Sequence, residues 1–595
     1  MKYSDYFMDV LKEHGYTTCF FVGGGNSMHL LESASSRFEC IAVTHEVTAA
    51  IATEYFNYAS KSKEKAFALV TAGPGLTNLI TGIAGAWLDF RELLIVGGQA
   101  KSTNLSRGTV RQMGHQEING TKLVATIVKK AFRIEKPILD QKIYEIISLS
   151  WESSPGPVFV EVCLDVSASD IEPHAKKPNK SINFRKRNLF KINSYINIIR
   201  LKKNLEKSKR PLILLGNSIS KESARRIRDI ARKHKIPIAC TWTGADKCGF
   251  DYEYFAGRPN TYGMRWANIF QQQTDLLIAI GTNLGFQQTG FNTDEFITKG
   301  SIFHILADKE ELRKRNPKKR YKINLNPNEF SEILCKIITK NQSRFDDWSD
   351  FLIEIKELIP TLEDCQKSTD NFSSPHEIIN YVSKISGKND QIIACSSGGT
   401  MTATMQCFEN HSEQTLLTNE GLASMGYGLA GAIGASIFNK ECRTILFEGD
   451  GGFLQNAQEI STAKSNNLNL KIFLTCNDGY ASIRTSQKNY FNEHYIGCDD
   501  KTGLKMPNWK VFFAAFEIEV FTIDSKNITS PEFLEKWNNT GTTVFLINAD
   551  PNQMYLPKIY SVVDSSGQMK STPLHLMSPS LDKATELQVI KFIKI

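Results

Sequence analysis

The chain has 595 residues, which is too many for one hydrophobic core and predicts three or more domains. Its hydrophobic content of 41% and charged content of 23% are those of an ordinary soluble globular protein. The formal charge of +8 is spread along the chain rather than gathered among aromatic residues, which argues against a nucleic-acid-binding protein.

Cysteine usage and the N-terminus indicate the compartment. The twelve cysteines are scattered, with no Cys-x-x-Cys pair and no cluster with histidine, so we expect reduced thiols in a cytoplasmic protein rather than disulfides or a zinc site. Residues 1–16 have an amphipathic helix pattern that contains acids, unlike a signal peptide. No apolar run approaches the ~18 residues of a membrane span, so no membrane partner is expected.

Strand and helix patterns alternate over residues 1–167, which predicts a doubly wound parallel sheet. Strands are expected at 19–25, 41–44, 66–71 and 93–98. The second ends on His45-Glu46 with helix from Val47, so Glu46 would lie at the sheet edge where such folds bind ligands. An acid near a helix N-terminus is also favoured by the helix dipole alone.

Residues 168–190 are polar and basic and are expected to form an exposed linker. A second α/β unit is predicted over 191–343, with strands at 210–216, 236–241, 276–281 and 301–306 and a helix at 221–235. Alone it is a generic nucleotide-type fold. An acidic helical segment at 344–372 would link it to the third unit.

The third unit is predicted over 373–565, followed by a tail at 566–595, with strands at 391–395, 415–418, 444–447 and 470–475. The third strand runs into Gly449-Asp450-Gly451-Gly452, and the fourth runs into Asn477. Backbone N–H groups at a helix N-terminus would suit a diphosphate, and Asp450 and Asn477 could offer oxygens to Mg²⁺. A Gly-Asp-Gly turn is common in α/β proteins, so other motifs must decide whether this one binds a diphosphate.

The two motifs resemble the thiamine diphosphate (ThDP) motif, which opens with Gly-Asp-Gly and closes with an Asn pair one strand later. The resemblance implies that Asp450, Asn477 and the main-chain carbonyl of Gly479 are metal ligands. Cys476 stands where the first Asn of the pair usually stands, but the ligand position is kept.

The first unit carries matching motifs: Glu46, then Gly-Pro-Gly-x-Thr-Asn at 73–78, then Gly-His-Gln-Glu at 114–117. Together they look like the pyrimidine-binding domain of acetolactate synthase and its ThDP-dependent relatives. The resemblance implies three doubly wound domains, in the order pyrimidine-binding, middle nucleotide-type and diphosphate-binding. It also implies that Glu46 bonds the aminopyrimidine ring and promotes loss of the thiazolium C2 proton. His115 and Gln116 would lie on the substrate side, although His115 could equally be an ordinary loop histidine.

Further cofactor contacts are implied by the same resemblance. They are Gly25, Pro74, Asn78, Ser397, Gly398, Gly399, Ala423, Met425, Gly451, Gly452 and Ile483. Met425 would wedge between the two rings of the cofactor, or it could be a core methionine. In acetolactate synthases the middle domain holds FAD in a structural role, and the residues near it here would be Gly216, Gly263 and Gly281. Asn283 replaces the Arg that usually stands beside the FAD phosphate.

The implied reaction removes CO₂ from a 2-oxo acid, such as pyruvate, and transfers the acyl anion to a carbonyl acceptor. The implied assembly is a homodimer or dimer of dimers with active sites between chains. Ser486 stands where acetolactate synthases carry a Trp, which favours a larger acceptor such as a nucleotide-linked keto-deoxysugar. The alternatives are a plain acetolactate synthase, a decarboxylase or hydrolase that ligates nothing, and an inactive regulatory subunit. The last would be expected to have lost Glu46, Asp450 or Asn477.

Overall fold

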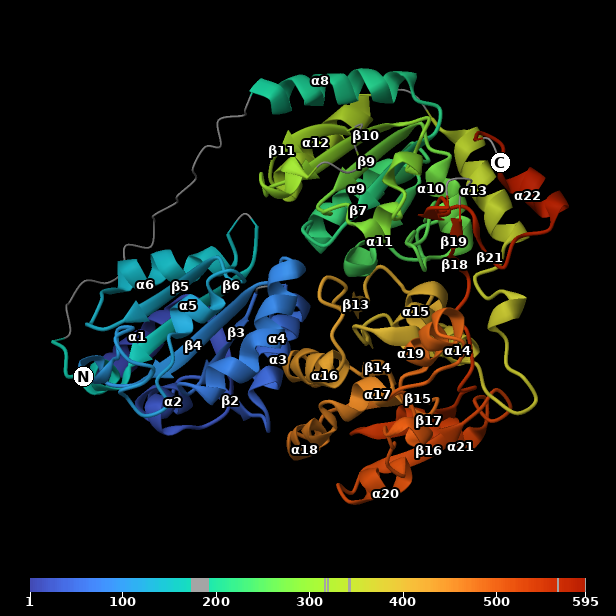
Figure 1. The fold of residues 1–595 in the computed structure, drawn as a ribbon. Helices are drawn as coiled ribbons and strands as arrows, with labels where there is room; N and C mark the ends of the chain where they lie inside the picture. The colour runs from blue at the N-terminus through green and yellow to red at the C-terminus, as the bar shows by residue number, and fades with distance from the viewer. Residues whose placement is uncertain are drawn as a thin grey trace.

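The computed structural model describes residues 1–61, 63–152, 154–172, 192–314, 317, 320–340, 344–563 and 567–593. Within these residues the longer strands form three parallel sheets flanked by helices (Figure 1). The prediction of three parallel-sheet α/β domains is therefore confirmed. The predicted linker at 168–190 lies outside the described residues from residue 173 onward. No described helix combines the length and the apolar character that a membrane crossing requires.

The first domain has the strand order β2-β1-β3-β4-β6-β5. Its strands are β1 Tyr16–Phe21, β2 Glu39–Ala42, β3 Lys65–Val70, β4 Leu93–Gln99, β5 Lys130–Ile134 and β6 Pro157–Cys163. Its helices are α1 Tyr3–Glu13, α2 Met28–Ser35, α3 Glu46–Ala59, α4 Pro74–Leu88, α5 Gly120–Val124, α6 Asp140–Ile147 and α7 Leu164–Ala168. The second strand ends two residues earlier than predicted, and α3 begins at Glu46 itself.

The middle domain has the order β11-β10-β9-β7-β8. Its strands are β7 Pro211–Leu215, β8 Ile238–Cys240, β9 Leu276–Ile280, β10 Ser301–Leu306 and β11 Arg320–Asn324. Its helices are α8 Ile192–Lys207, α9 Lys221–Lys233, α10 Arg265–Gln272, α11 Phe286–Thr289 and α12 Pro327–Lys340. The predicted helical link contains α13 Asp346–Leu358, whose apolar face packs into the middle-domain core together with Leu574 and Val589 of the C-terminal tail.

The third domain has the order β13-β12-β14-β15-β17-β16, which repeats the first domain strand for strand. Its strands are β12 Gln391–Ala394, β13 Thr415–Leu417, β14 Thr444–Gly449, β15 Leu470–Cys476, β16 Glu519–Ile523 and β17 Thr543–Asn548. Its helices are α14 Pro375–Ile385, α15 Gly398–Cys407, α16 Tyr427–Phe438, α17 Asp450–Leu454, α18 Ile460–Ser465, α19 Ala481–Tyr490, α20 Trp509–Ala514 and α21 Pro531–Asn538. The tail adds strands β18 Lys558–Ile559, β19 Ser561–Val563, β20 Met569–Ser571 and β21 Met577–Ser578, and helix α22 Lys583–Val589.

The first and third domains share one apolar core. Helices α3 and α4 cover one face of the first sheet, and α16 of the third domain packs directly on α3 (Figure 1). Because α16 also contacts α17, it lies between the first domain and the turn that carries Asp450. The Glu46 segment of the first domain and the Asp450 turn of the third are thus joined through a packed helix pair.

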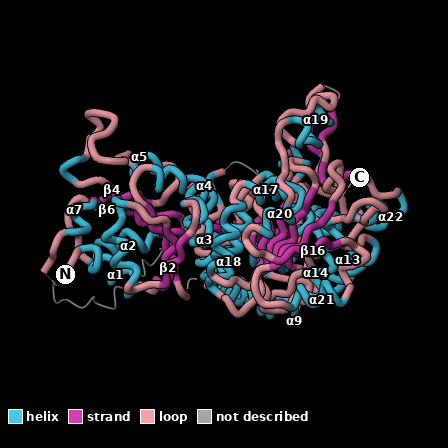
Figure 2. The backbone as a smooth tube through the Cα atoms, turned by 90° about the horizontal axis from the view of Figure 1, so that it is seen from below, coloured by secondary structure: helices cyan, strands magenta, loops and turns pink. Residues whose placement is uncertain are grey.

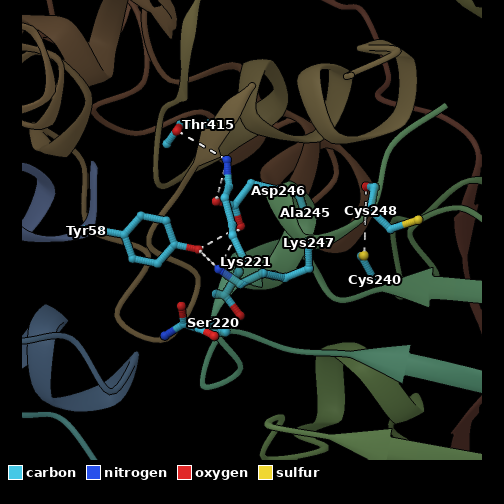
Figure 3. Close-up of polar contacts among 12 residues, drawn as sticks. Tyr58, Ser220, Lys221, Cys240, Ala245, Asp246, Lys247, Cys248 and Thr415 are labelled. Atoms are coloured by element: carbon cyan, nitrogen blue, oxygen red, sulfur yellow. Dashed lines mark hydrogen bonds and ion pairs between the residues drawn. The ribbon is translucent and has the colours of Figure 1, made fainter. Parts of the chain in front are cut away.

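A polar junction connects all three domains. Figure 3 shows Tyr58 of α3 reaching the middle domain, where its hydroxyl donates to Asp246 Oδ1 at 2.8 Å and accepts from Lys247 Nζ at 2.6 Å. Lys221 Nζ lies 3.3 Å from Asp246 Oδ2 and donates to the carbonyl oxygen of Gln414 in the third domain at 2.6 Å. Burial would raise the pKa of Asp246, but the two lysines hold it well below its usual range. The buried acid is thereby kept ionised and paired.

Candidate functional site

The Gly-Asp-Gly turn lies where β14 ends and α17 begins. The Asp450 carboxylate is 1% exposed and accepts from the backbone N–H groups of Gly451 at 2.8 Å, Asn477 at 3.1 Å and Gly479 at 3.2 Å. Burial raises the pKa of Asp450 to about 6, although these N–H groups act to lower it. Since β14 and β15 are neighbours, their ends bring the two motifs together as the sequence predicts.

The side chains of Asp450 and Asn477 and the carbonyl of Gly479 form an oxygen cluster. The Asn477 amide oxygen faces Asp450 Oδ1 and the Gly479 carbonyl oxygen, each 3.2 Å away, while Nδ2 lies 3.3 Å from the Tyr555 hydroxyl. Facing acceptors without a proton repel one another, and turning the amide would replace that repulsion with two hydrogen bonds. In either orientation, the Asp450 carboxylate, the Asn477 side-chain amide and the Gly479 carbonyl bring together oxygen donors of the kind that Mg²⁺ prefers, so these residues fit Mg²⁺.

Within the described ranges there is no group of three or more His, Cys, Asp or Glu side chains that could hold a metal. The oxygen cluster uses one carboxylate, one amide and one carbonyl, so it is a different kind of site. Such a set leaves positions for the phosphate oxygens with which Mg²⁺ is usually shared. This is the donor chemistry that the ThDP resemblance requires.

The turn from Asn477 to Gly479 has a left-handed backbone. Asp478 has φ 59° and Gly479 has φ 104°, and a Cβ on Gly479 would lie 2.8 Å from the Cys498 carbonyl oxygen. Glycine is therefore required here. Arg484 of α19 donates to the carbonyl oxygens of Asn477 at 3.1 Å and Asp478 at 2.8 Å. Arg484 holds the shape of the ligand turn, a role that sequence patterns did not reveal.

Tyr555 is a second residue that the sequence did not single out. Its hydroxyl contacts Asn477, and its ring lies so close to Gly399 that a Cβ there would be 1.8 Å from the ring. Ser397 is the N-cap of α15, and Gly398 and Gly399 are its first residues. The predicted Ser-Gly-Gly turn thus lies beside the oxygen cluster, with Tyr555 packed on it.

A pocket of about 250 Å³ adjoins this turn. Gly398, Gly399, Ala423, Ser482 and Tyr555 line it from the third domain. The middle domain contributes Trp242, Tyr262 and Gln287. No described residue of the first domain lines this pocket.

Several residues predicted to touch the cofactor are exposed in the single chain. Met425 is 36% exposed and Ile483 is 48% exposed, so the alternative of a core methionine is wrong. Ile483 and Ser486 lie on α19, which projects from the body of the molecule (Figure 2). Ser486 is exposed one turn beyond Ser482, which lines the pocket. Ala423 has φ 54°, an uncommon backbone for a residue with a side chain.

In the first domain the structure brings Glu46 and Asn78 together. Glu46 is the first residue of α3, is 9% exposed, and accepts from Asn78 Nδ2 at 2.8 Å. Pro74 begins α4, the helix that carries Asn78, and Gly25 has open space where a Cβ would be. We call Glu46 and Asn78 the Glu46 pair. Its place at a helix N-terminus agrees with both explanations offered for this acid.

The predicted substrate-side loop is held by Glu117. The Glu117 carboxylate accepts from the N–H groups of Ser106, Met113 and Gly114, and these bonds lower its pKa to about 2 although burial would raise it. His115 is exposed, and its carbonyl accepts from Asn26 Nδ2 at 3.2 Å. Gln116 has φ 57° and its carbonyl oxygen would be 2.6 Å from a Cβ on Gly73. The loop therefore packs against the turn that precedes α4.

The three middle-domain glycines are explained by packing within the chain. A Cβ on Gly216 would lie 2.4 Å from the Gly281 carbonyl oxygen, one on Gly263 would lie 2.3 Å from Asn260 N, and one on Gly281 would lie 2.9 Å from Ile219 N. Asn283 accepts from Gly285 N at 3.1 Å, as an ordinary turn residue does. These positions therefore give no support to a flavin, and no step below depends on one.

Three family models match the chain in the order of its domains. Residues 1–123 match "Thiamine pyrophosphate enzyme, N-terminal TPP binding domain", residues 198–332 match "Thiamine pyrophosphate enzyme, central domain", and residues 397–547 match "Thiamine pyrophosphate enzyme, C-terminal TPP binding domain". The Glu46 pair lies in the first of these ranges and the oxygen cluster in the last.

Known relatives agree over almost the whole length. The acetolactate synthase isozyme 2 large subunit of Escherichia coli (strain K12) is 24% identical over 570 residues, which cover 94% of this chain and 97% of that protein. The acetolactate synthase large subunit of Pyropia yezoensis is 26% identical over 533 residues, or 87% of each chain. That of Cyanidium caldarium is 27% identical over 504 residues, covering 82% and 83%. The chain belongs to the thiamine diphosphate-dependent enzymes of the acetolactate synthase-like family, which are of the carboligase and decarboxylase type.

Proposed function

We propose that the chain removes CO₂ from a 2-oxo acid, with pyruvate as the first candidate, and transfers the acyl anion to a carbonyl acceptor. The oxygen cluster of Asp450, Asn477 and Gly479 is the observation that carries the proposal. When bound, ThDP supplies a nucleophilic carbon that attacks the 2-oxo acid and stores the electron pair left by CO₂. The twelve free cysteines suit a reducing, cytoplasmic setting.

The protein's own residues divide the work. Asp450, Asn477 and the Gly479 carbonyl would hold Mg²⁺ and through it the diphosphate, and the N-termini of α15 and α17 would offer N–H groups to the same anion. Glu46, held by Asn78, would bond the ring nitrogen of the aminopyrimidine and control the proton there. Met425 is 36% exposed, and the exposed part of its side chain would contact the cofactor rings.

We propose that a working site needs two chains. Among the described residues no hydrogen bond joins the Glu46 pair to the oxygen cluster, and the pocket beside the cluster has no wall from the first domain. The exposed Met425, Ile483 and Ser486 would be covered when the first domain of a second chain approaches. A C2 dimer would then contain two such sites, and a dimer of dimers four.

Two carbonyl acceptors are candidates for the proposed reaction. Ser486 is exposed beyond the pocket edge, which leaves room for a large acceptor such as a nucleotide-linked keto-deoxysugar. A second candidate is acetolactate formation, which the names of the relatives favour. Mass spectrometry of products from pyruvate, with a keto-sugar nucleotide and a 2-oxo acid as competing acceptors, separates the two. Acetaldehyde as the only product would instead indicate a plain decarboxylase.

A structural flavin is implied by the family resemblance alone, and the glycine positions do not support it. Purified protein with a flavin spectrum would establish FAD. Colourless protein whose melting temperature does not rise on adding FAD would remove it from the proposed function. In either case the carboligation transfers no net electrons to a flavin.

A further inference from the structure

One buried acid of the third domain reaches across to the segment that carries Glu46. Glu459 is fully buried in the short turn between α17 and α18. Its Oε1 accepts from His45 N at 2.9 Å, from Thr44 N at 3.1 Å and from Thr44 Oγ1 at 2.6 Å. These two residues directly precede Glu46.

The contact holds the start of α3 from outside. His45 is the N-cap of α3 and Glu46 is its first residue, so Glu459 places a carboxylate beside the positive end of the helix dipole. The His45 ring supplies only a long bond of 3.4 Å to Val47 N. Fixing two successive N–H groups and one hydroxyl defines where the chain enters the helix, and therefore where the Glu46 side chain begins.

Glu459 is itself firmly held. Thr462 Oγ1 donates to Glu459 Oε2 at 2.8 Å. In the same turn, Asn456 Nδ2 donates to the carbonyl oxygen of Gly426 at 2.7 Å, next to Met425. The turn that holds Asn456 and Glu459 thus contacts both Gly426, the residue after Met425, and the segment that carries Glu46.

We propose that Glu459 is a positioning residue that sets the placement of Glu46 for proton transfer, an inference that rests on the proposed function. A carboxylate accepts all four donors at once, whereas a glutamine at this position has only one acceptor oxygen. Glu459→Gln should therefore loosen Thr44 and His45 without altering the oxygen cluster.

The first test compares turnover with cofactor affinity. For Glu459→Gln we expect turnover to fall about tenfold to hundredfold, because small misplacements of reacting groups have effects of this size. The Kd for ThDP and Mg²⁺, measured by calorimetry without substrate, should stay within about twofold because this variant leaves every diphosphate contact in place. Thr44→Val should lower turnover by less than Glu459→Gln does. Thr44→Ser, which keeps the hydroxyl, should have turnover close to that of wild type. A buried acid elsewhere in the third domain, Asp390→Asn, is the control for general destabilisation.

The second test does not need a working enzyme. In cofactor-free protein, hydrogen exchange of the Thr44 and His45 amides should be at least about tenfold faster in Glu459→Gln than in wild type, since their acceptor is weakened. Unchanged exchange would overturn the proposal, as would turnover within about twofold of wild type, or parallel losses of turnover and cofactor affinity. If wild type binds no ThDP, the proposed function fails, while the exchange data still decide whether Glu459 holds this segment.

Discussion

In the proposed function, the oxygen cluster and the Glu46 pair are the two halves of one site, and the structure builds them in different ways. The cluster is complete within one domain, because the ends of two neighbouring strands and one left-handed turn bring its three groups together. The Glu46 pair lies in another domain and depends on a packed helix interface and on Glu459 for its position. The oxygen cluster should therefore bind Mg²⁺ and the diphosphate without help from the Glu46 pair. The Glu46 pair should affect turnover more than cofactor affinity.

The largest expected effect comes from breaking the cluster. Asp450→Ala removes the carboxylate that receives three N–H groups and offers an oxygen to the cation, so ThDP with Mg²⁺ should no longer bind in calorimetry and turnover should be lost. The neighbouring Asp478→Asn is the matched control, because Asp478 is exposed and Asn tolerates its backbone conformation. Normal cofactor binding by Asp450→Ala would contradict the assignment.

Changing Glu46 should lower turnover while leaving the affinity for ThDP almost unaltered. Glu46→Gln keeps the size of the side chain but cannot control the proton, so turnover should fall ~10²–10⁴-fold. The Kd for ThDP should be nearly unchanged. Glu39→Gln, an exposed acid on β2 that pairs with Lys440, is the control and should behave like wild type. Near-normal turnover in Glu46→Gln would remove Glu46 from the mechanism.

The two halves of the proposed site show which residues a sequence pattern can identify and which it cannot. The motifs at Asp450 and Asn477 were found because each follows its own strand and the strands are neighbours. Tyr555 and Glu459 were missed because their partners lie 78 and 414 residues away, and no local pattern encodes such contacts. Arg484 was missed for a different reason: it lies on α19, only five residues beyond Gly479, but its bonds to the turn depend on the left-handed backbone there.

The fold shows the same division. Buried strands such as β10 and β15 were predicted nearly to the residue because they are continuous apolar runs. Edge strands β5 and β16 are half-exposed and carry no such run, so their sequences do not distinguish them from loops. The apolar run of β6 has the same signal as the predicted strands and is recognisable once the pattern is followed to Cys163.

A third prediction asks whether the surface around α19 limits the acceptor. Ser486→Trp should fill the space beyond Ser482, with a loss of about tenfold or more in ligation to a large acceptor, since overpacking of ~1–3 kcal/mol corresponds to such a rate effect. Release of CO₂ from pyruvate should survive. Lys488→Trp places the same ring elsewhere on α19 and should leave the product ratio unchanged. Equal losses in both steps would show that Ser486 does not select the acceptor.

The smallest effect concerns the Glu117 loop, which packs against the turn that precedes α4. Since hydrogen bonds lower the folded-state pKa of Glu117 to about 2, Glu117 stabilises the protein above its unfolded pKa of about 4.3, and this stabilisation is lost as the pH falls towards 2. Glu117→Gln should cost about 3 kcal/mol at neutral pH and progressively less in acid. Melting temperatures at several pH values check this, with the exposed Glu32→Gln as control. A difference that does not shrink in acid would contradict the assigned role.

The central claim, that each site combines the cluster of one chain with the Glu46 pair of another, is tested most directly by mixing two inactive variants. Co-expression of Asp450→Ala chains with Glu46→Gln chains gives mixed dimers in which one site has both halves intact and the other has neither. If the site is shared, turnover should return to about a quarter of wild type, because about half of randomly assembled dimers are mixed and each has one working site. If each chain builds its own site, every site in the mixture carries one defect, and turnover will stay at the level of the separate variants.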